Sequence, residues 1–331
     1  MRGAELSKQI YPPAPDRLPI ARREPRLRTA YSSYPPEWDT PLVKLERESE
    51  QHGCTVYAKL ELVNPTGVHK DRESSAVIAD MKKKGFRALA CASSGNAAIS
   101  VSAFAYMNGF ESHVFVGSEI PQEKLTLVKM FHPVLHTVEG DYLDAVEALK
   151  KFIAGRKVYN ANAGFCEAKL VGNSYIGMEV AREAKPSYVI CPTNNGTHFV
   201  GVGLGVKKVG VRVCMVAAIA PDTEIAHSIK GYYHLEEPKI SAMIDQTCGS
   251  FVKLTDDELK RATVSLAQQG IVAEPASAAS VAALSHLRLQ EQDVVCCTIT
   301  GSGLKYPALT ASMLKKWTAF SSREVLPKNN S

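Results

Sequence analysis

The stretch ICPTNNGTHFVGVGLG, residues 190–205, has the pattern of a buried strand, a polar turn and a helix in direct succession. A short apolar run precedes the turn, and the segment after it is long enough for a helix. Short apolar runs alternate with helix-length segments along most of the chain. This alternation predicts an α/β fold with mostly parallel sheets and helices on both faces. In such sheets ligands bind where the carboxyl ends of the strands lead into helices.

The expected strands are Thr55–Leu62, Arg87–Ala92, Ser112–Val116, Val134–Val138, Val158–Asn160, Ser187–Cys191, Val211–Ala217 and Val294–Ile299. The expected helices include Ser74–Lys84, Ala97–Asn108, Asp141–Ala154, Ala168–Glu183, Asp256–Gln269 and Ala276–Leu289. Several of them run into a glycine, which is typical of a helix C-terminus.

The 331 residues, 45% of them apolar, suggest about two lobes, each large enough to bury a core. No apolar run approaches the ~20 residues that cross a bilayer. The first residues lack the apolar core of a secretory signal, so we expect a cytoplasmic protein without membrane partners. The eight cysteines form no C-x-x-C pair and the nine histidines no H-E-x-x-H pattern, so we expect no metal site.

Most of the net charge of +5 lies in residues 1–30, which hold seven basic and three acidic residues. The remainder of the chain is nearly neutral. We therefore interpret residues 1–39 as a solvated basic arm, with packing on a partner subunit as the alternative. Because no basic stripe follows the arm, we expect no nucleic-acid partner.

Four predicted strand ends carry polar residues that suit chemistry. Lys70, in NPTGVHKDRESS (64–75), stands at a helix start, where the positive end of the helix dipole lowers the pKa of an amine. In CASSGNAAIS (91–100), hydroxyls, an amide and backbone N–H groups form a candidate anion cradle. Thr197, in the turn after residue 192, suits a phosphate, and Thr300 follows the last strand. Taken singly, these motifs are also typical of ordinary structure. Lys70 could be a solvated lysine, residues 91–100 a simple helix cap, and the segments at Thr197 and Thr300 simple turns or loops.

Other nucleotide and nucleophile motifs are missing. The glycines at 201, 203 and 205 lie inside a helix-like segment, and the chain has no G-x-x-x-x-G-K-[ST] loop and no G-x-S-x-G elbow. Dehydrogenase, P-loop and serine-hydrolase functions are therefore disfavoured.

Taken together and in this order, the motifs resemble those of the fold type II pyridoxal-phosphate enzymes, and among them most resemble threonine synthase. The most specific are NPTG-x-x-KDR (64–72), AEPASAAS (273–280) and TGSGLK (300–305). The resemblance extends from Thr40-Pro41-Leu42-Val43 to about residue 306. It implies a two-lobed fold like that of the tryptophan synthase β chain. The large cofactor-binding lobe would comprise residues 40–85 and 166–331, and a small mobile lobe residues 86–165.

The resemblance also implies roles for individual residues. Lys70 would form the Schiff base with pyridoxal phosphate and serve as the catalytic base and acid. Asn96 would contact the phenolic oxygen of the cofactor and Thr300 its ring nitrogen. The substrate carboxylate would be bound by Ser93, Ser94 and Gly95, and the cofactor phosphate by Asn194, Asn195, Gly196 and Thr197. Glu274 would lie near the ring.

Three departures from the family pattern concern the substrate or the cofactor phosphate. His69 replaces the usual aromatic residue before the lysine, and it either fills space or contacts the substrate as an acid–base group. The phosphate turn contains Asn194, Asn195 and His198 where the family is richer in glycine. The stretch 160–174, NANAGFCEAKLVGNS, lacks the N-P-x-R grip on a substrate phosphate, and Lys169 is the candidate substitute for its arginine.

The resulting prediction is a lyase or synthase that eliminates or replaces a side-chain group of a small amino acid, as threonine synthase does with O-phosphohomoserine. A β-replacement synthase of the cysteate- or diaminoacid-forming type and a threonine/serine dehydratase remain alternatives. A catalytically silent homologue that binds the cofactor or a ligand is a second class, and a protein that binds nucleic acid or a partner through the basic arm is a third. The family further suggests a homodimer.

Overall fold

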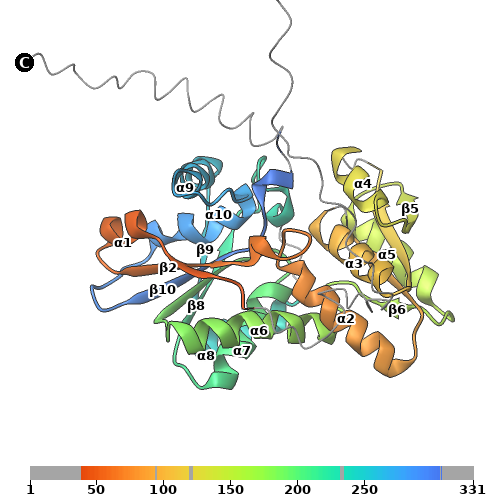
Figure 1. Ribbon diagram of the computed structural model, residues 1–331, viewed down its shortest axis with the longest axis horizontal. Helices are drawn as coiled ribbons and strands as arrows, with labels where there is room; N and C mark the ends of the chain where they lie inside the picture. The colour runs from red at the N-terminus through yellow and green to blue at the C-terminus, as the bar shows by residue number, and fades with distance from the viewer. Residues whose placement is uncertain (1–38, 94, 119–121, 232–234, 306, 308–331) are drawn as a thin grey trace, which may run out of the picture.

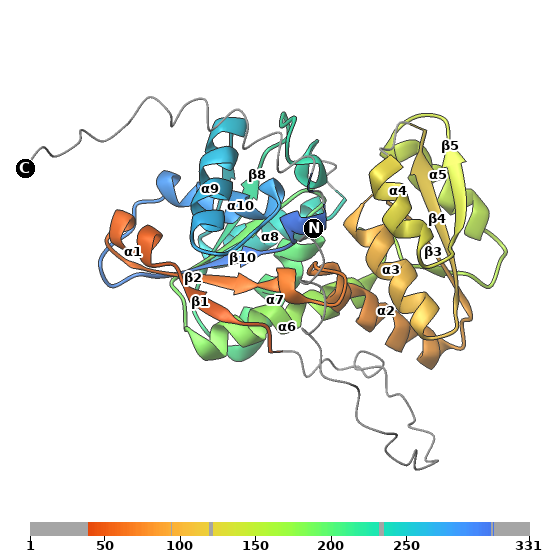
Figure 2. The same ribbon diagram turned by 45° about the horizontal axis from the view of Figure 1, so that its top comes forward.

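The protein contains two sheets with helices on both faces, as the computed structural model in Figures 1 and 2 shows for residues 39–93, 95–118, 122–231, 235–305 and 307. The larger sheet has six strands in the order β1-β2-β10-β7-β8-β9, and the smaller has four in the order β5-β4-β3-β6. Only β1 and β2 pair antiparallel among these strands. The α/β fold with mostly parallel sheets is thereby confirmed. The basic arm, apart from Asp39, lies outside the described residues.

The strands are β1 Leu42–Lys44, β2 Thr55–Leu60, β3 Ala88–Ala92, β4 Glu111–Gly117, β5 Val134–Val138, β6 Tyr159–Asn160, β7 Tyr188–Pro192, β8 Cys214–Ile219, β9 Ser250–Lys253 and β10 Val294–Ile299. The helices are α1 Glu46–His52, α2 Lys70–Lys84, α3 Asn96–Met107, α4 Gln122–Lys129, α5 Tyr142–Ile153, α6 Glu167–Glu183, α7 Thr197–Val209, α8 Glu237–Thr247, α9 Asp256–Gln268 and α10 Pro275–Ala282. Short 3₁₀ turns occupy Glu61–Val63, His227–Ile229, Ala283–His286 and Gly303–Lys305. None of these helices is long and apolar enough to cross a membrane.

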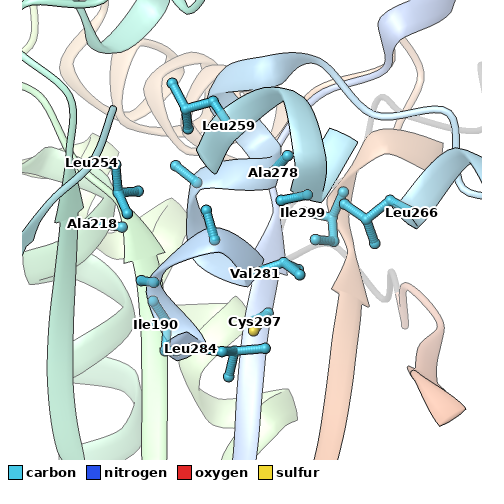
Figure 3. Packing of buried hydrophobic residues seen from close by; sticks show 14 of the residues in the cluster. Ile190, Ala218, Leu254, Leu259, Leu266, Ala278, Val281, Leu284, Cys297 and Ile299 are labelled. Carbon is cyan, nitrogen blue, oxygen red and sulfur yellow. The ribbon is translucent and has the colours of Figure 1, made fainter. Parts of the chain in front are cut away.

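The large sheet is a buried layer between two groups of helices. Alternate residues of β10 face opposite sides: Val295, Cys297 and Ile299 pack beneath α9 and α10, while Cys296 joins the core beneath α6, α7 and α8. Figure 3 shows the first of these cores, where Leu259 and Leu266 of α9 approach the strands. Because both faces are covered, the strand is almost continuously apolar, as parallel strands usually are.

The small sheet is built in the same way. Leu89 and Cys91 of β3 pack against α2, α3 and α4, whereas Ala90 and Ala92 pack against α5. All four of its strands fall between residues 86 and 165, the interval predicted for the small lobe. Movement of that lobe stays a prediction.

Two helices link the sheets. The first turn of α2 is buried beside α6, and its later residues Val77, Ile78 and Met81 enter the core of the small sheet. Helix α6 in turn crosses α7 with their backbones in contact. A Cβ atom on Gly177 would overlap the carbonyl oxygen of Val202, and one on Gly205 that of Ser174. Both positions therefore require glycine, and α6 and α7 form one tightly packed pair.

Most of the expected elements are present within a residue or two of their expected ends. Helix α2 begins at Lys70 rather than Ser74, and the expected helix Ala276–Leu289 stops at Ala282 and continues as a 3₁₀ turn. The prediction did not include β1, β9, α1, α4 or α8. These elements are short or carry many polar residues, so their apolar patterns are weak.

Candidate active site

A cavity of about 230 Å³ lies between the two sheets, at the carboxyl ends of their strands. Most of the predicted site residues line it, namely His69, Lys70, Ser93, Gly95, Asn96, Lys169, Asn194, Asn195, Gly196 and Thr300. Ser94 lies outside the described residues. The cavity therefore brings together predicted site residues that are up to 231 positions apart in the chain, His69 and Thr300.

Lys70 is the first residue of α2, and its side chain is largely buried. Its Nζ donates a hydrogen bond to Oε1 of Glu73, one turn later, at 2.7 Å. Burial lowers the pKa of Lys70, and the nearby charge of Lys169 lowers it further, while Glu73 opposes both. A lysine with a lowered pKa in a cavity suits nucleophilic chemistry at an amine.

Glu73 is fully buried between two ammonium groups. Besides Lys70, the Nζ of Lys169 lies 3.2 Å from its Oε2, and Asn173 donates to its Oε1 at 2.9 Å. Burial alone would raise the pKa of Glu73, but the charges of Lys70 and Lys169 lower it to about 2. Glu73 is thus a carboxylate at every physiological pH.

Two buried histidines lie beside this ion pair. The rings of His69 and His198 are 4.4 Å apart, and His198 bridges Asn173 and Thr298 with its two nitrogens, each at 3.0 Å. Burial and the charge of Lys70 hold the pKa of His69 well below its usual value and lower that of His198 to about 4. Both rings are therefore neutral at pH 7.

A second set of hydrogen-bonded polar side chains includes Asn96, Glu274 and Thr300, which also line the cavity. The amide of Asn96 donates to Oε1 of Glu274 at 2.7 Å, and the Nζ of Lys305 donates to the amide oxygen of Asn96 at 2.6 Å. The hydroxyls of Thr300 and Ser277 are hydrogen bonded at 2.9 Å. The Asn96 amide and the Thr300 hydroxyl are thus held in fixed orientations at neighbouring strand ends.

The turn after β7 leads into the N-terminus of α7. Gly196 has φ of 93°, a left-handed conformation, and a Cβ atom there would overlap Ile240. Thr197 begins the helix, and its buried hydroxyl has no hydrogen-bond partner. An unpaired buried hydroxyl beside free helix N–H groups is costly unless an anion binds there. The Oδ1 atom of Asn194 is likewise buried and unpaired.

Tyr142, at the start of α5, joins the small sheet to this turn. Its side chain hydrogen bonds with Asn162 on its own side of the cavity and with Asn195 of the turn.

Sequence reasoning missed several residues of the site. Glu73 and Asn173 hold Lys70 and Lys169 in place, Ser277 hydrogen bonds with Thr300, and Lys305 contacts Asn96. The spacing of Glu73, three residues after Lys70 on a helix, is a signal that could have revealed the first pair.

Comparison with known proteins agrees with this geometry. The family described as pyridoxal-phosphate dependent enzyme matches residues 34–301. Curated relatives include the threonine synthase of Mycobacterium leprae, 29% identical over 82% of this chain and 83% of its own. That of Halalkalibacterium halodurans is 27% identical over 90% and 89%. Among solved structures, maize serine racemase superimposes with a TM-score of 0.75 over 89% of this chain and 97% of its own, at 18% identity, which shows the fold.

The cavity suits a pyridoxal phosphate group on three grounds. The unpaired Thr197 hydroxyl and the helix start at Gly196 offer donors to a phosphate. Lys70 offers an amine whose pKa is lowered, and the Thr300 hydroxyl offers a neutral partner for a ring nitrogen. In the turn, the Asn194 amide donates to the carbonyl oxygens of Ser228 and Lys230.

Proposed function

This chain belongs to the pyridoxal-phosphate dependent enzymes, and on that premise we propose that it eliminates or replaces a side-chain group of a small amino acid. The observation that carries the proposal is the convergence of Lys70, Asn96 and Thr300 around one cavity. Gly196 of the turn after β7 also lines this cavity, and the unpaired hydroxyl of Thr197, which is not a lining residue, follows it directly in the chain. The cofactor, when bound, supplies an electron sink for the charge that develops when the substrate loses its α-proton.

In this proposal Lys70 anchors the cofactor through Nζ and, once displaced by the substrate amine, takes and returns the α-proton at the same atom. Burial favours this role because it lowers the pKa of the amine. Glu73, 2.7 Å away, receives the displaced amine, pairs with the ammonium that forms when this amine takes the α-proton, and keeps it within reach of the substrate. Lys70 therefore needs no large movement between its two tasks.

The remaining residues orient the reactants. Asn96 is held between Glu274 and Lys305 and would present its amide to the phenolic oxygen of the cofactor. Thr300 offers a hydroxyl rather than a carboxylate to the ring nitrogen, which leaves that nitrogen largely unprotonated. This weaker electron sink favours elimination and replacement over transamination. Ser93 and Gly95, with Ser94, would bind the substrate carboxylate at the start of α3.

The curated relatives named threonine synthase support a reaction of that type. We propose a carbon–oxygen lyase of amino-acid biosynthesis; the alternatives are a β-replacement synthase or a threonine/serine dehydratase, and a silent homologue that binds the cofactor without turnover. We further propose, from the family resemblance, a cytoplasmic homodimer. Residues 86–165 would move as a lid and exclude water when substrate binds.

The test is the visible absorbance of the purified protein with added pyridoxal phosphate. Wild type and Lys84→Ala, which changes an exposed lysine, should show the band of cofactor bound to a lysine. Lys70→Ala should lose it. Titration with serine, threonine, homoserine and their phosphate esters should then shift the band, and product analysis should identify the reaction. If wild type shows no band, or Lys70→Ala keeps it, the proposal is refuted.

A further inference from the structure

The charges around the cavity restrict the side chain of the substrate, an inference that rests on the function proposed above. Among the described residues that line the cavity, the lysines are Lys70 and Lys169, and there is no arginine. In that proposal Lys70 is bound to the cofactor when the substrate enters, and after its displacement it takes and returns the α-proton. Lys169 is therefore the one remaining lysine of this described lining that could pair with an anionic substrate group.

Lys169 is already paired within the protein. Only 2% of the residue is exposed, and its Nζ lies 3.2 Å from Oε2 of Glu73. Asn173 holds Glu73 from the other side, donating both to Glu73 and to the carbonyl oxygen of Lys169. When the cofactor engages Lys70, the Glu73 carboxylate pairs with Lys169 alone. The ammonium of Lys169 is then compensated by a fixed, buried carboxylate, and a substrate phosphate would have to compete with that carboxylate.

The main anion-binding feature of the cavity also has an occupant under the proposed function. The helix start at Gly196 and Thr197 offers its donors to the cofactor phosphate. A second phosphate, on a substrate, would carry about two negative charges into the same cavity. It would also lie near the carboxylates of Glu73 and Glu274.

His69 favours a different side chain. Its Nδ1 lies 3.2 Å from the carbonyl oxygen of Thr300, which can only accept, so Nδ1 carries the proton. Nε2 is then an acceptor, and it is buried without a hydrogen-bond partner. It also lies 3.8 Å from Oε1 of Glu73. A hydroxyl can donate to Nε2, whereas a phosphate dianion has no proton to donate.

We propose that the substrate is a small amino acid whose side chain carries a free hydroxyl, and that Glu73 disfavours phosphorylated amino acids by neutralising Lys169. His69 accepts the hydrogen bond of the substrate hydroxyl at Nε2. The pair Glu73–Lys169 is thus a specificity determinant.

The test compares binding of matched pairs, serine against O-phosphoserine and homoserine against O-phosphohomoserine. Dissociation constants come from the shift of the cofactor absorbance band and from ligand-induced thermal stabilisation. Wild type should bind each hydroxy amino acid about tenfold or more tightly than its phosphate ester, equivalent to loss of one charge-assisted contact. Glu73→Gln should free the charge of Lys169. It should reduce the ratio of the two dissociation constants, phosphate ester over hydroxy amino acid, by about tenfold. Lys169→Met should leave the ratio unchanged or increase it.

Tighter binding of either phosphate ester by wild type would overturn the inference, as would an unchanged ratio in a folded Glu73→Gln protein. Should Glu73→Gln fail to fold, the wild-type ratio of dissociation constants still decides. The double variant Glu73→Gln/Lys169→Met, which removes both charges, gives a second measurement. It should discriminate less against the phosphate esters than Lys169→Met does. A cofactor band that no amino acid shifts would overturn the proposed function and this inference with it. A band shifted only by phosphate esters would overturn this inference and leave the proposed function standing.

Discussion

Replacement of Arg72 by methionine should lower the free energy of unfolding by about 3–5 kcal/mol, the usual cost of removing one partner from a buried ion pair. Arg72 is fully buried and donates to Glu61 at 2.9 and 3.1 Å and to Glu179 at 2.8 Å. Methionine preserves the packing of the aliphatic stem, but Glu61 then retains only the donors of Thr40 and Asn64. An uncompensated carboxylate remains in the core.

Equilibrium urea unfolding, followed by circular dichroism, measures the effect. With a slope of about 3 kcal/mol per molar, the midpoint should fall by about 1–1.7 M. Lys84→Met removes an exposed lysine from its pair with Asp80 and is the control, with an expected loss below about 1 kcal/mol. Adding Glu61→Gln to Arg72→Met should recover part of the loss, because the stranded charge is removed. A loss for Arg72→Met no larger than that of the control would refute the reasoning.

Three further predictions concern the turn and the start of α2. Gly196→Ala should lower the free energy of unfolding by about 1–3 kcal/mol and weaken cofactor binding, because φ is left-handed and the methyl would overlap Ile240. Gly210 is also left-handed but lies in open space, so Gly210→Ala should destabilise the protein less. Spectroscopic titration should find its cofactor affinity unchanged. Thr197→Val should weaken cofactor binding about tenfold in the same titration, and the free energy of unfolding without cofactor should be unchanged or higher, because the hydroxyl has no partner among the described residues. Equal cofactor affinity would contradict its phosphate role. Burial raises the pKa of Asp71 to about 6, above 3.8, so its contribution to stability is full at low pH and is lost as pH rises from about 4 to 6. Asp71→Asn should therefore gain stability relative to wild type across that interval in urea unfolding, and a constant difference between the two proteins would show that Asp71 does not titrate there.

The fold followed from sequence where burial imposes a simple pattern. The apolar run at β10 predicts its strand because that strand is covered on both faces, and Val294–Ile299 is found as predicted. The antiparallel edge strand β1 was missed, since its three residues offer little pattern and two of them are exposed. Lys70 was predicted at a helix start, but the predicted helix range began only at Ser74. In the structure α2 begins at Lys70, and Asp71, Arg72 and Glu73 in its first turn are buried by partners from distant segments.

The candidate site likewise has residues that the sequence predicts and contacts that it does not. Lys70, Asn96 and Thr300 could be identified because each follows a strand within a recognisable motif. The link between Glu73 and Lys169 could not, because it depends on how α2 crosses α6, and no local pattern encodes that crossing. Lys169 was predicted as a substrate contact from its place in the chain, and its role stays a prediction. The partner that restricts it became visible only in three dimensions.

If residues 86–165 move as proposed, the glycine-mediated contact between α6 and α7 would keep the opposing wall of the cavity stationary. Lys169 and Asn173 are carried by α6, while Gly196 and Thr197 begin α7, and the two helices interlock at Gly177 and Gly205. Side chains on α6 therefore keep a fixed position relative to the turn at Gly196 and Thr197, although α6 directly follows the small sheet in the chain. Tyr142, by contrast, would travel with a moving lid. Specificity would then be imposed on the substrate at first encounter, before closure, and would not depend on how far the lid swings.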